Sequence, residues 1–214
     1  MRPVICMITA SAGGTTDDAA LVARVAAAAR AGVHLIQIRQ PARDARPLVR
    51  LVERAVAAVR GTQTRVLVND RLDVAMAAGA HGVHLRGDSM PAARVRTMAP
   101  AGFVVGRSVH SPDEARSVTS DGSVDYVLVG TIFPTASKPG AAVAGLGMLA
   151  AACHATSVPV LAVGGMQLER LTSVADAGAA GVAAIGLFAA PSIDALETTV
   201  ERVVLAFDTL RTLP

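Results

Sequence analysis

Polar residues whose types suit catalysis follow several short apolar segments that have the composition of buried strands. Where two of them are separated by one residue, as Ser108 and His110 are, they share one face of a strand. Histidine transfers protons near pH 7, carboxylates hold hard cations, and arginine or lysine binds phosphate and carboxylate groups. The residues concerned are Gln37, Arg39, Asn69, Asp70, His84, Arg86, Asp88, Ser108, His110, Thr131, Thr135, Ser137 and Lys138.

His110 lies in the segment GRSVHSPDE and is the main candidate for acid/base chemistry. The same segment is also typical of a helix start, with Ser111 as the capping residue and Pro112 at the first helical position. The two interpretations are compatible, because a helix beginning there would leave His110 beside it. We therefore expect His110 to be functional, and His84 to line the interior or the substrate cavity.

Two glycine-containing turns favour a phosphate site. Gly164, Gly165 and Met166 follow one apolar segment, and Ile185 and Gly186 end the last one. Glycine lets backbone N–H groups approach phosphate oxygens closely. Either turn alone would be weak, and both could be plain tight turns, but their position after the seventh and eighth segments favours phosphate binding.

Carboxylates and a single lysine add two further candidates. Asp70 and Asp88 together could hold Mg²⁺ with substrate phosphate, although Asp70 could instead cap a helix beginning at Arg71 or pair with that arginine. Lys138 is the one lysine among 20 lysine and arginine residues. It lies in a loop that contains glycine and proline. Either this position requires an ammonium group, or a single lysine has been kept here by chance.

The elements that position these residues alternate along the whole chain. Amphipathic segments rich in alanine, leucine and arginine separate the apolar segments, as in repeated βα units. We expect one (β/α)8 barrel over residues 1–214, with the polar residues at its C-terminal face. A doubly wound open sheet is the alternative, although it usually has fewer strands. The expected strands are Val4–Thr9, Leu35–Arg39, Val66–Asp70, Gly82–Arg86, Val104–Ser108, Tyr126–Gly130, Val160–Gly164 and Gly181–Gly186.

Composition restricts the partners. The 214 residues are 52% hydrophobic but 2% aromatic, which predicts a core of small aliphatic side chains. The net charge of +3 and the scattered arginines argue against nucleic acid. No apolar run reaches the roughly 20 residues of a membrane span or looks like a secretion signal, so we expect a cytoplasmic protein with Cys6 and Cys153 reduced. A homo-oligomer is compatible with the sequence, but no dimer surface is evident.

A family resemblance covers nearly the whole chain. Its segments, in order, are LVNDRLDVAMAAGAHGVHL, VGRSVHSPDEA, DYVLVGTIFPTASKPG, PVLAVGGM and GVAAIG. Together they resemble the superfamily of thiamine phosphate synthases and TenI-type thiazole tautomerases. The resemblance implies a barrel that binds a thiazole phosphate, with the phosphate on the loops after strands 7 and 8.

The chain departs from the synthase pattern at two points. The resemblance implies a Gln-x-Arg-x-Lys pattern after strand 2 in synthases, and here Pro41 stands in place of that lysine. After strand 4 the resemblance implies a His-x-Gly-Gln-x-Asp pattern in synthases, whereas this chain has HLRGDS. Ser89 therefore stands in the position of the metal-binding Asp, and Asp88 comes one residue early. The segment GRSVHS, with Arg107, is similar to the tautomerase branch. Asn69, Asp70, Thr135 and Lys138 are still similar to a synthase.

We therefore favour a tautomerase in which His110 moves a proton within a dihydrothiazole carboxylate phosphate without a cofactor, while Arg39 or Lys138 offsets the carboxylate charge. The alternative is a thiamine phosphate synthase. It would join thiazole phosphate to hydroxymethylpyrimidine diphosphate with Mg²⁺ on Asp70 and, if it reaches, Asp88. A third hypothesis is a non-catalytic regulatory protein that binds thiazole phosphate.

Overall fold

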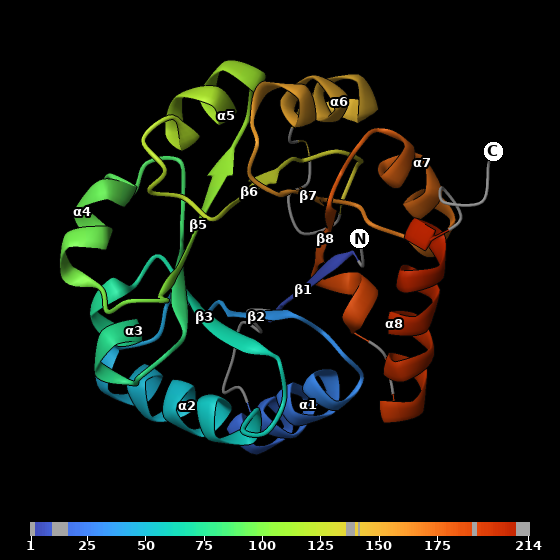
Figure 1. Ribbon diagram of the computed structural model, residues 1–214. Helices are drawn as coiled ribbons and strands as arrows, with labels where there is room; N and C mark the ends of the chain where they lie inside the picture. The colour runs from blue at the N-terminus through green and yellow to red at the C-terminus, as the bar shows by residue number, and fades with distance from the viewer. Residues whose placement is uncertain (1–2, 10–16, 136–139, 141, 190–191, 209–214) are drawn as a thin grey trace.

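The computed structural model describes residues 3–9, 17–135, 140, 142–189 and 192–208. Eight parallel strands lie side by side in the order β1 to β8, with the helices outside them (Figure 1). β8 pairs with β1, where Gly181 lies opposite Val4, so the sheet closes on itself. This closure confirms the (β/α)8 barrel and excludes the open doubly wound sheet.

Each strand is followed by a helix, and two 3-10 turns precede the last two helices. The strands are β1 (Val4–Ile8), β2 (Leu35–Ile38), β3 (Arg65–Asn69), β4 (Gly82–Leu85), β5 (Val104–Val109), β6 (Tyr126–Val129), β7 (Val160–Val163) and β8 (Gly181–Ala184). The helices are α1 (Asp18–Arg30), α2 (Ala45–Ala58), α3 (Leu72–Ala77), α4 (Ala92–Met98), α5 (Pro112–Thr119), α6 (Gly145–Ala155), η1 (Leu168–Arg170), α7 (Leu171–Asp176), η2 (Gly186–Phe188) and α8 (Ile193–Asp208).

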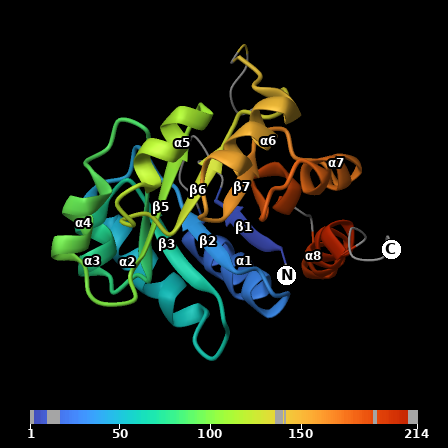
Figure 2. The same ribbon diagram turned by 45° about the horizontal axis from the view of Figure 1, so that its top comes forward.

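Alternation along each strand divides the apolar residues between two layers. In β2, Leu35 belongs to a small cluster inside the barrel, whereas Ile36 and Ile38 belong to the larger cluster between strands and helices. Strands buried on both faces need apolar residues at nearly every position, which explains the continuous runs in the sequence. Figure 2 shows the helices outside the strands from a second direction. Small aliphatic side chains dominate both layers, as the composition predicts.

Three helix ends explain how the chain turns back into the next strand. Gly32, Gly79 and Gly178 have φ angles of 93°, 63° and 89°. This left-handed conformation closes the end of a helix and is strained for residues with a side chain. Each of the three glycines lies between the end of a helix and the strand that follows it.

Strand ends differ from expectation by one or two residues. The expected β2, β3 and β4 include Arg39, Asp70 and Arg86, but each of these residues lies just beyond the last paired residue of its strand. Conversely, β5 continues to Val109. Polar residues at the mouth leave the strand ladder because the backbone turns there into the loop that presents them to the cavity.

Within the described residues, no helix is both long enough and apolar enough to cross a lipid bilayer.

Candidate active site

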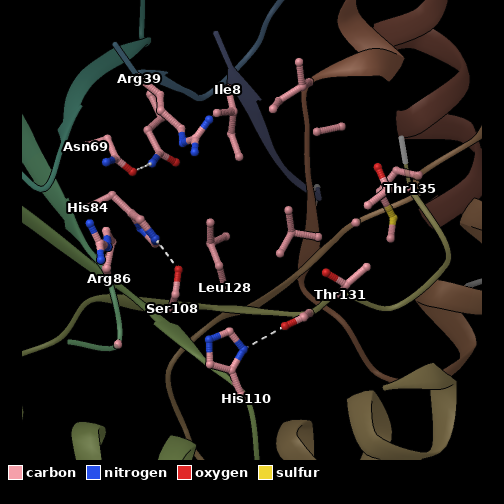
Figure 3. Close-up of a pocket in the computed structure, with 18 of the residues that line it drawn as sticks. Ile8, Arg39, Asn69, His84, Arg86, Ser108, His110, Leu128, Thr131 and Thr135 are labelled. Atoms are coloured by element: carbon pink, nitrogen blue, oxygen red, sulfur yellow. Dashed lines mark hydrogen bonds between the residues drawn. The ribbon is translucent and has the colours of Figure 1, made fainter. Parts of the chain in front are cut away.

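A cavity of about 880 Å³ opens at the C-terminal ends of the strands. Its size suits one or two small-molecule ligands. Figure 3 shows side chains from opposite strands pointing into it. Of the residues predicted from the sequence, it is lined by Gln37, Arg39, Asn69, His84, Arg86, Asp88, Ser108, His110, Thr131, Thr135, Gly164, Gly165, Met166, Ile185 and Gly186. Asp70 is not part of this lining but lies 3.7 Å from Arg86, which is, and Ser137 and Lys138 lie outside the described residues.

The β7 and β8 side of the cavity is built from backbone. Gly164 and Gly165 have φ angles of 99° and 64°, which a side chain would strain. A Cβ at Gly165 would also lie 2.8 Å from the Phe133 Cβ atom. The backbone N–H groups of Gly165 and Gly186 donate to no other residue in the described part of the chain. Both are therefore available to a ligand.

Neighbouring loops fix the shape of this backbone. The Phe133 N–H group donates to the Gly164 carbonyl over 3.2 Å. Arg170 donates from Nη1 to the Gly165 carbonyl over 2.8 Å, and its guanidinium lies 4.8 Å from the centre of the Phe133 ring. The Gly164 and Gly165 carbonyls are thus engaged, so the loop is held with little freedom before any ligand arrives.

Side chains form the opposite wall. Gln37 is 2% exposed and donates from Nε2 to Asn69 Oδ1 over 2.7 Å (Figure 3). The buried Oε1 atom of Gln37 has no hydrogen-bond donor among the described residues. Buried oxygens are rarely left without a donor, so this atom marks a position where a ligand N–H or O–H group would fit.

Arg39 supplies the uncommitted positive charge of this wall. Its backbone N–H group donates to Thr9 Oγ1 over 2.9 Å, which fixes the start of the loop after β2. Its guanidinium lines the cavity and forms no ion pair with another described residue. Five N–H donors in one plane suit phosphate and carboxylate groups.

The two predicted metal-binding carboxylates surround one arginine. Arg86 Nη2 lies 2.5 Å from Asp88 Oδ2, and Arg86 Nη1 lies 3.7 Å from Asp70 Oδ2. Asp70 also accepts a hydrogen bond from the Ser89 hydroxyl. Asp70 neither caps the helix after Arg71 nor pairs with it, because Arg71 bonds Asp73 instead. No cluster of three or more His, Cys, Asp or Glu side chains suits a metal ion among the residues the structure covers.

Arg107 holds the loop that carries these carboxylates. It is 8% exposed and donates to the main-chain carbonyls of Gly87, Ser89 and Met90 over 2.9 to 3.3 Å. This arginine belongs to the segment GRSVHS, but its contact with the loop after β4 depends on tertiary structure. Its role is to position the loop, since its side chain does not line the cavity.

His110 lies at the mouth with a defined hydrogen-bond pattern. Its Nδ1 atom lies 2.9 Å from the Gly130 carbonyl oxygen (Figure 3), and because a carbonyl can only accept, Nδ1 carries the proton. Its main-chain N–H group donates to Glu114 Oε2, and Ser111 caps α5 by accepting from the Glu114 N–H group, as predicted. In neutral His110, Nε2 is therefore the basic nitrogen.

His84 is interior and forms part of a buried chain of polar groups. Nδ1 lies 3.0 Å from the Tyr126 hydroxyl, and Nε2 lies 2.9 Å from Ser108 Oγ. Burial, and to a smaller extent the nearby Arg107 guanidinium, lowers the pKa of His84 to about 3. His84 is neutral at physiological pH. Burial also raises the pKa of Tyr126 well above its usual value, so its hydroxyl keeps its proton.

Tyr126 bonds His84, which lines the cavity, and is one of the residues that the sequence did not indicate. It is the only tyrosine in the chain and begins an otherwise aliphatic strand. Its being a single tyrosine in an aliphatic strand is the one feature of the sequence that could have pointed to a role for it. It does not reveal His84, because the two residues are 42 positions apart and meet only through the barrel register.

Fold and site together define the class of (β/α)8 barrels with a polar cavity at the C-terminal ends of the strands. Comparison with known proteins specifies the family. A family model described as thiamine monophosphate synthase matches residues 5–188. The chain therefore belongs to the thiamine monophosphate synthase family.

Individual relatives agree with this assignment. A thiamine-phosphate synthase of Chlorobium luteolum is 35% identical over 184 residues, covering 86% of this chain and 84% of the relative. One from Roseiflexus sp. is 38% identical over 189 residues, covering 87% and 80%. A match to one from Coprothermobacter proteolyticus is 44% identical but spans 56% of each chain.

Two solved structures share the fold of this chain. A thiamine phosphate pyrophosphorylase from Pyrococcus furiosus has a TM-score of 0.81 and 25% identity, covering 97% of this chain and 96% of its own. A 3-hexulose-6-phosphate synthase has a TM-score of 0.70 at 20% identity over 96% and 99% of the two chains. The second likeness concerns the fold alone.

Proposed function

We propose that this chain is a thiamine-phosphate synthase, which joins a thiazole phosphate to hydroxymethylpyrimidine diphosphate. The observation that carries the proposal is the division of the cavity into a backbone wall with free N–H groups and an opposite wall with the uncommitted Arg39 guanidinium. The two walls thus offer separate binding positions for two anionic groups. The three relatives described above are named thiamine-phosphate synthases, which supports this function better than the tautomerase that we favour from the sequence.

The backbone wall would hold the thiazole phosphate. N–H groups of Gly165 and Gly186 would donate to phosphate oxygens without the entropy cost of ordering long side chains. Because Arg170 already engages the Gly165 carbonyl, its charge also offsets part of the phosphate charge at short range.

The side-chain wall would hold the pyrimidine and its diphosphate. Gln37 Oε1 would accept a ligand hydrogen, and Arg39 would bind the diphosphate. In the reaction the bond between the pyrimidine methylene carbon and the diphosphate oxygen breaks, and its electron pair leaves with the diphosphate. The thiazole nitrogen then uses its lone pair to form the new C–N bond. Arg39 stabilises the charge that develops on the leaving diphosphate.

Asp70 and Asp88 fit a divalent cation because they already bracket one cationic group, the Arg86 guanidinium. Magnesium is usually held by one or two carboxylates together with substrate phosphate oxygens. When bound, it would supply charge neutralisation at the diphosphate. Arg86, whose side chain is 57% exposed, would have to move away from Asp88 for the carboxylates to take that role.

The test is a product assay on purified protein with both substrates, with and without Mg²⁺. Formation of thiamine phosphate is the expected result. A parallel reaction receives the dihydrothiazole carboxylate phosphate alone. Isomerisation of that compound, with no condensation under any metal condition, would replace the synthase by the tautomerase. Tight binding of thiazole phosphate without turnover of either mixture would favour the non-catalytic binder.

The tautomerase is the second candidate, and the geometry of His110 favours it. With Nδ1–H held by Gly130, Nε2 would take a proton from one ring carbon and return it at another atom. No metal is needed for this step, and Arg86 already neutralises part of the charge of Asp70 and Asp88. His110→Gln is expected to abolish isomerisation while thiazole phosphate still binds. His154→Gln, an exposed histidine on α6, is the matched control.

A further inference from the structure

Three strands bring a tyrosine, a histidine and a serine into one line inside the barrel. His84 in β4 lies opposite Gly106 in β5, and Gly106 lies opposite Tyr126 in β6. A Cβ atom at Gly106 would overlap the Tyr126 ring. The missing side chain therefore gives Tyr126 the space to reach across β5 to His84, where the ring centres are 5.6 Å apart. Ser108, two residues after Gly106, faces the same interior.

The hydrogen-bond roles in this line follow from its ends. Among the described residues, the one partner of the Tyr126 hydroxyl is His84 Nδ1. A buried phenol that accepted from Nδ1–H would leave its own hydrogen without an acceptor, which is unfavourable. Tyr126 therefore donates to Nδ1. Neutral imidazole carries one proton, so that proton is on Nε2 and is donated to Ser108 Oγ.

We propose that Tyr126 and His84 are positioning residues that fix the direction of the Ser108 hydroxyl. Because Ser108 Oγ accepts from His84, its own hydrogen points away from His84, and Ser108 lines the cavity. Ser108 is then a hydrogen-bond donor to the bound substrate, and the substrate atom that it contacts is an acceptor. The effect on turnover rests on the proposed function, whereas the tautomer of His84 does not.

The first experiment measures the tautomer directly. Protein labelled with ¹⁵N-histidine is observed by NMR at neutral pH, and the His84 signals are assigned by their loss in His84→Asn. The expected result is a single tautomer with the proton on Nε2. In Tyr126→Phe, which keeps the ring and removes the hydroxyl, we expect a mixture of both tautomers. A proton on Nδ1 in the unchanged protein would overturn the proposal.

The second experiment tests whether Tyr126 acts through Ser108. Tyr126→Phe is expected to lower kcat about tenfold, with a smaller change in KM, because a donor to the reacting substrate loses its orientation. The same substitution in Ser108→Ala protein is expected to have no further effect on kcat. Additive losses would show that Tyr126 supports only the fold and would overturn the positioning role. If neither reaction is catalysed at all, the proposed function fails while the tautomer measurement still stands.

Discussion

The two walls of the cavity differ in the material from which they are built. The β7 and β8 wall is backbone, shaped by Gly164, Gly165 and Gly186 and held from behind by Arg170. The β2 to β5 wall consists of long or polar side chains on separate strands. A backbone wall can contact any phosphate but discriminates little between the molecules that carry it, because N–H groups are the same at every residue.

The side-chain wall is where a change of reaction would occur. Pro41 in place of a lysine, and the pairing of Arg86 with Asp70 and Asp88, both lie on this wall. The glycine loops are compatible with either proposed reaction. Function within this family should therefore follow the chemistry of the loops after β2, β4 and β5, on a barrel that is otherwise shared.

The largest expected effect comes from removing the charge of the side-chain wall. Arg39→Ala should lower kcat/KM for thiamine phosphate formation about 100-fold, as expected for the loss of one group that stabilises developing negative charge. Steady-state kinetics with both substrates measures this change. Arg116→Ala, at an exposed pair with Asp113 on α5, is the control. An unchanged rate in Arg39→Ala would remove Arg39 from the mechanism.

Gly165→Ala should break the backbone wall. The left-handed φ angle and the contact with Phe133 oppose a Cβ there, so we expect a loss of about 2 kcal/mol in the free energy of unfolding. Affinity for thiazole phosphate should fall at the same time. Gly147→Ala, on α6 with open space around it, should instead add about 0.5–1 kcal/mol. Urea titration and calorimetry distinguish the two variants, and equal behaviour would contradict a strained glycine loop.

His84, inside the side-chain wall, should make the free energy of unfolding depend on pH. Its pKa is lowered from 6.5 to about 3 by burial, so the unfolded chain binds a proton that the folded chain excludes. Stability from this group is complete above pH 6.5 and falls by about 1.4 kcal/mol per pH unit between pH 6.5 and 3. Urea titrations at several pH values in this range measure the free energy of unfolding. This free energy should fall more steeply with decreasing pH in the unchanged protein than in His84→Asn. If the free energy of unfolding depended on pH equally in both proteins, the pKa of His84 would not be lowered by folding.

An ion pair whose two residues do not line the cavity should have the smallest effect. Arg43 makes two hydrogen bonds, of 2.6 and 2.7 Å, to the Asp18 carboxylate and so joins the loop after β2 to the start of α1. This bonding lowers the pKa of Asp18. Asp18→Asn should lower the free energy of unfolding by about 0.5–1 kcal/mol at pH 7, with less effect in high salt. Catalytic rates should be unchanged, and a lower rate would extend the active site beyond the mouth.

Much of the fold could be predicted because it depends on local patterns. Continuous apolar strands, glycines such as Gly32 at helix ends and the Ser111 cap are all determined within a few residues. The order of polar residues along the chain also predicted most of the cavity lining, because parallel strands bring their C-terminal ends to one face. Strand ends were less accurate, since pairing ceases where loops turn.

The contacts within the site could not be predicted, because they join residues that only closure of the barrel brings together. Tyr126 reaches His84 across Gly106, and Arg107 holds the loop after β4. Whether Asp88 faces a metal or an arginine depends on how the Arg86 side chain folds back, which the sequence HLRGDS does not specify. Sequence spacing identified the chemistry available, while the partners required three-dimensional structure.

The most direct test of the division between the two walls is calorimetric titration of thiazole phosphate into the unchanged protein and into Arg39→Ala. Arg39 belongs to the wall opposite the glycine loops, so the two dissociation constants should agree within about threefold, less than the loss of one hydrogen bond to a charged group. A loss of affinity of more than about tenfold, equal to 1.4 kcal/mol, would mean that one anion contacts both walls. That result would contradict separate sites for the two anionic groups.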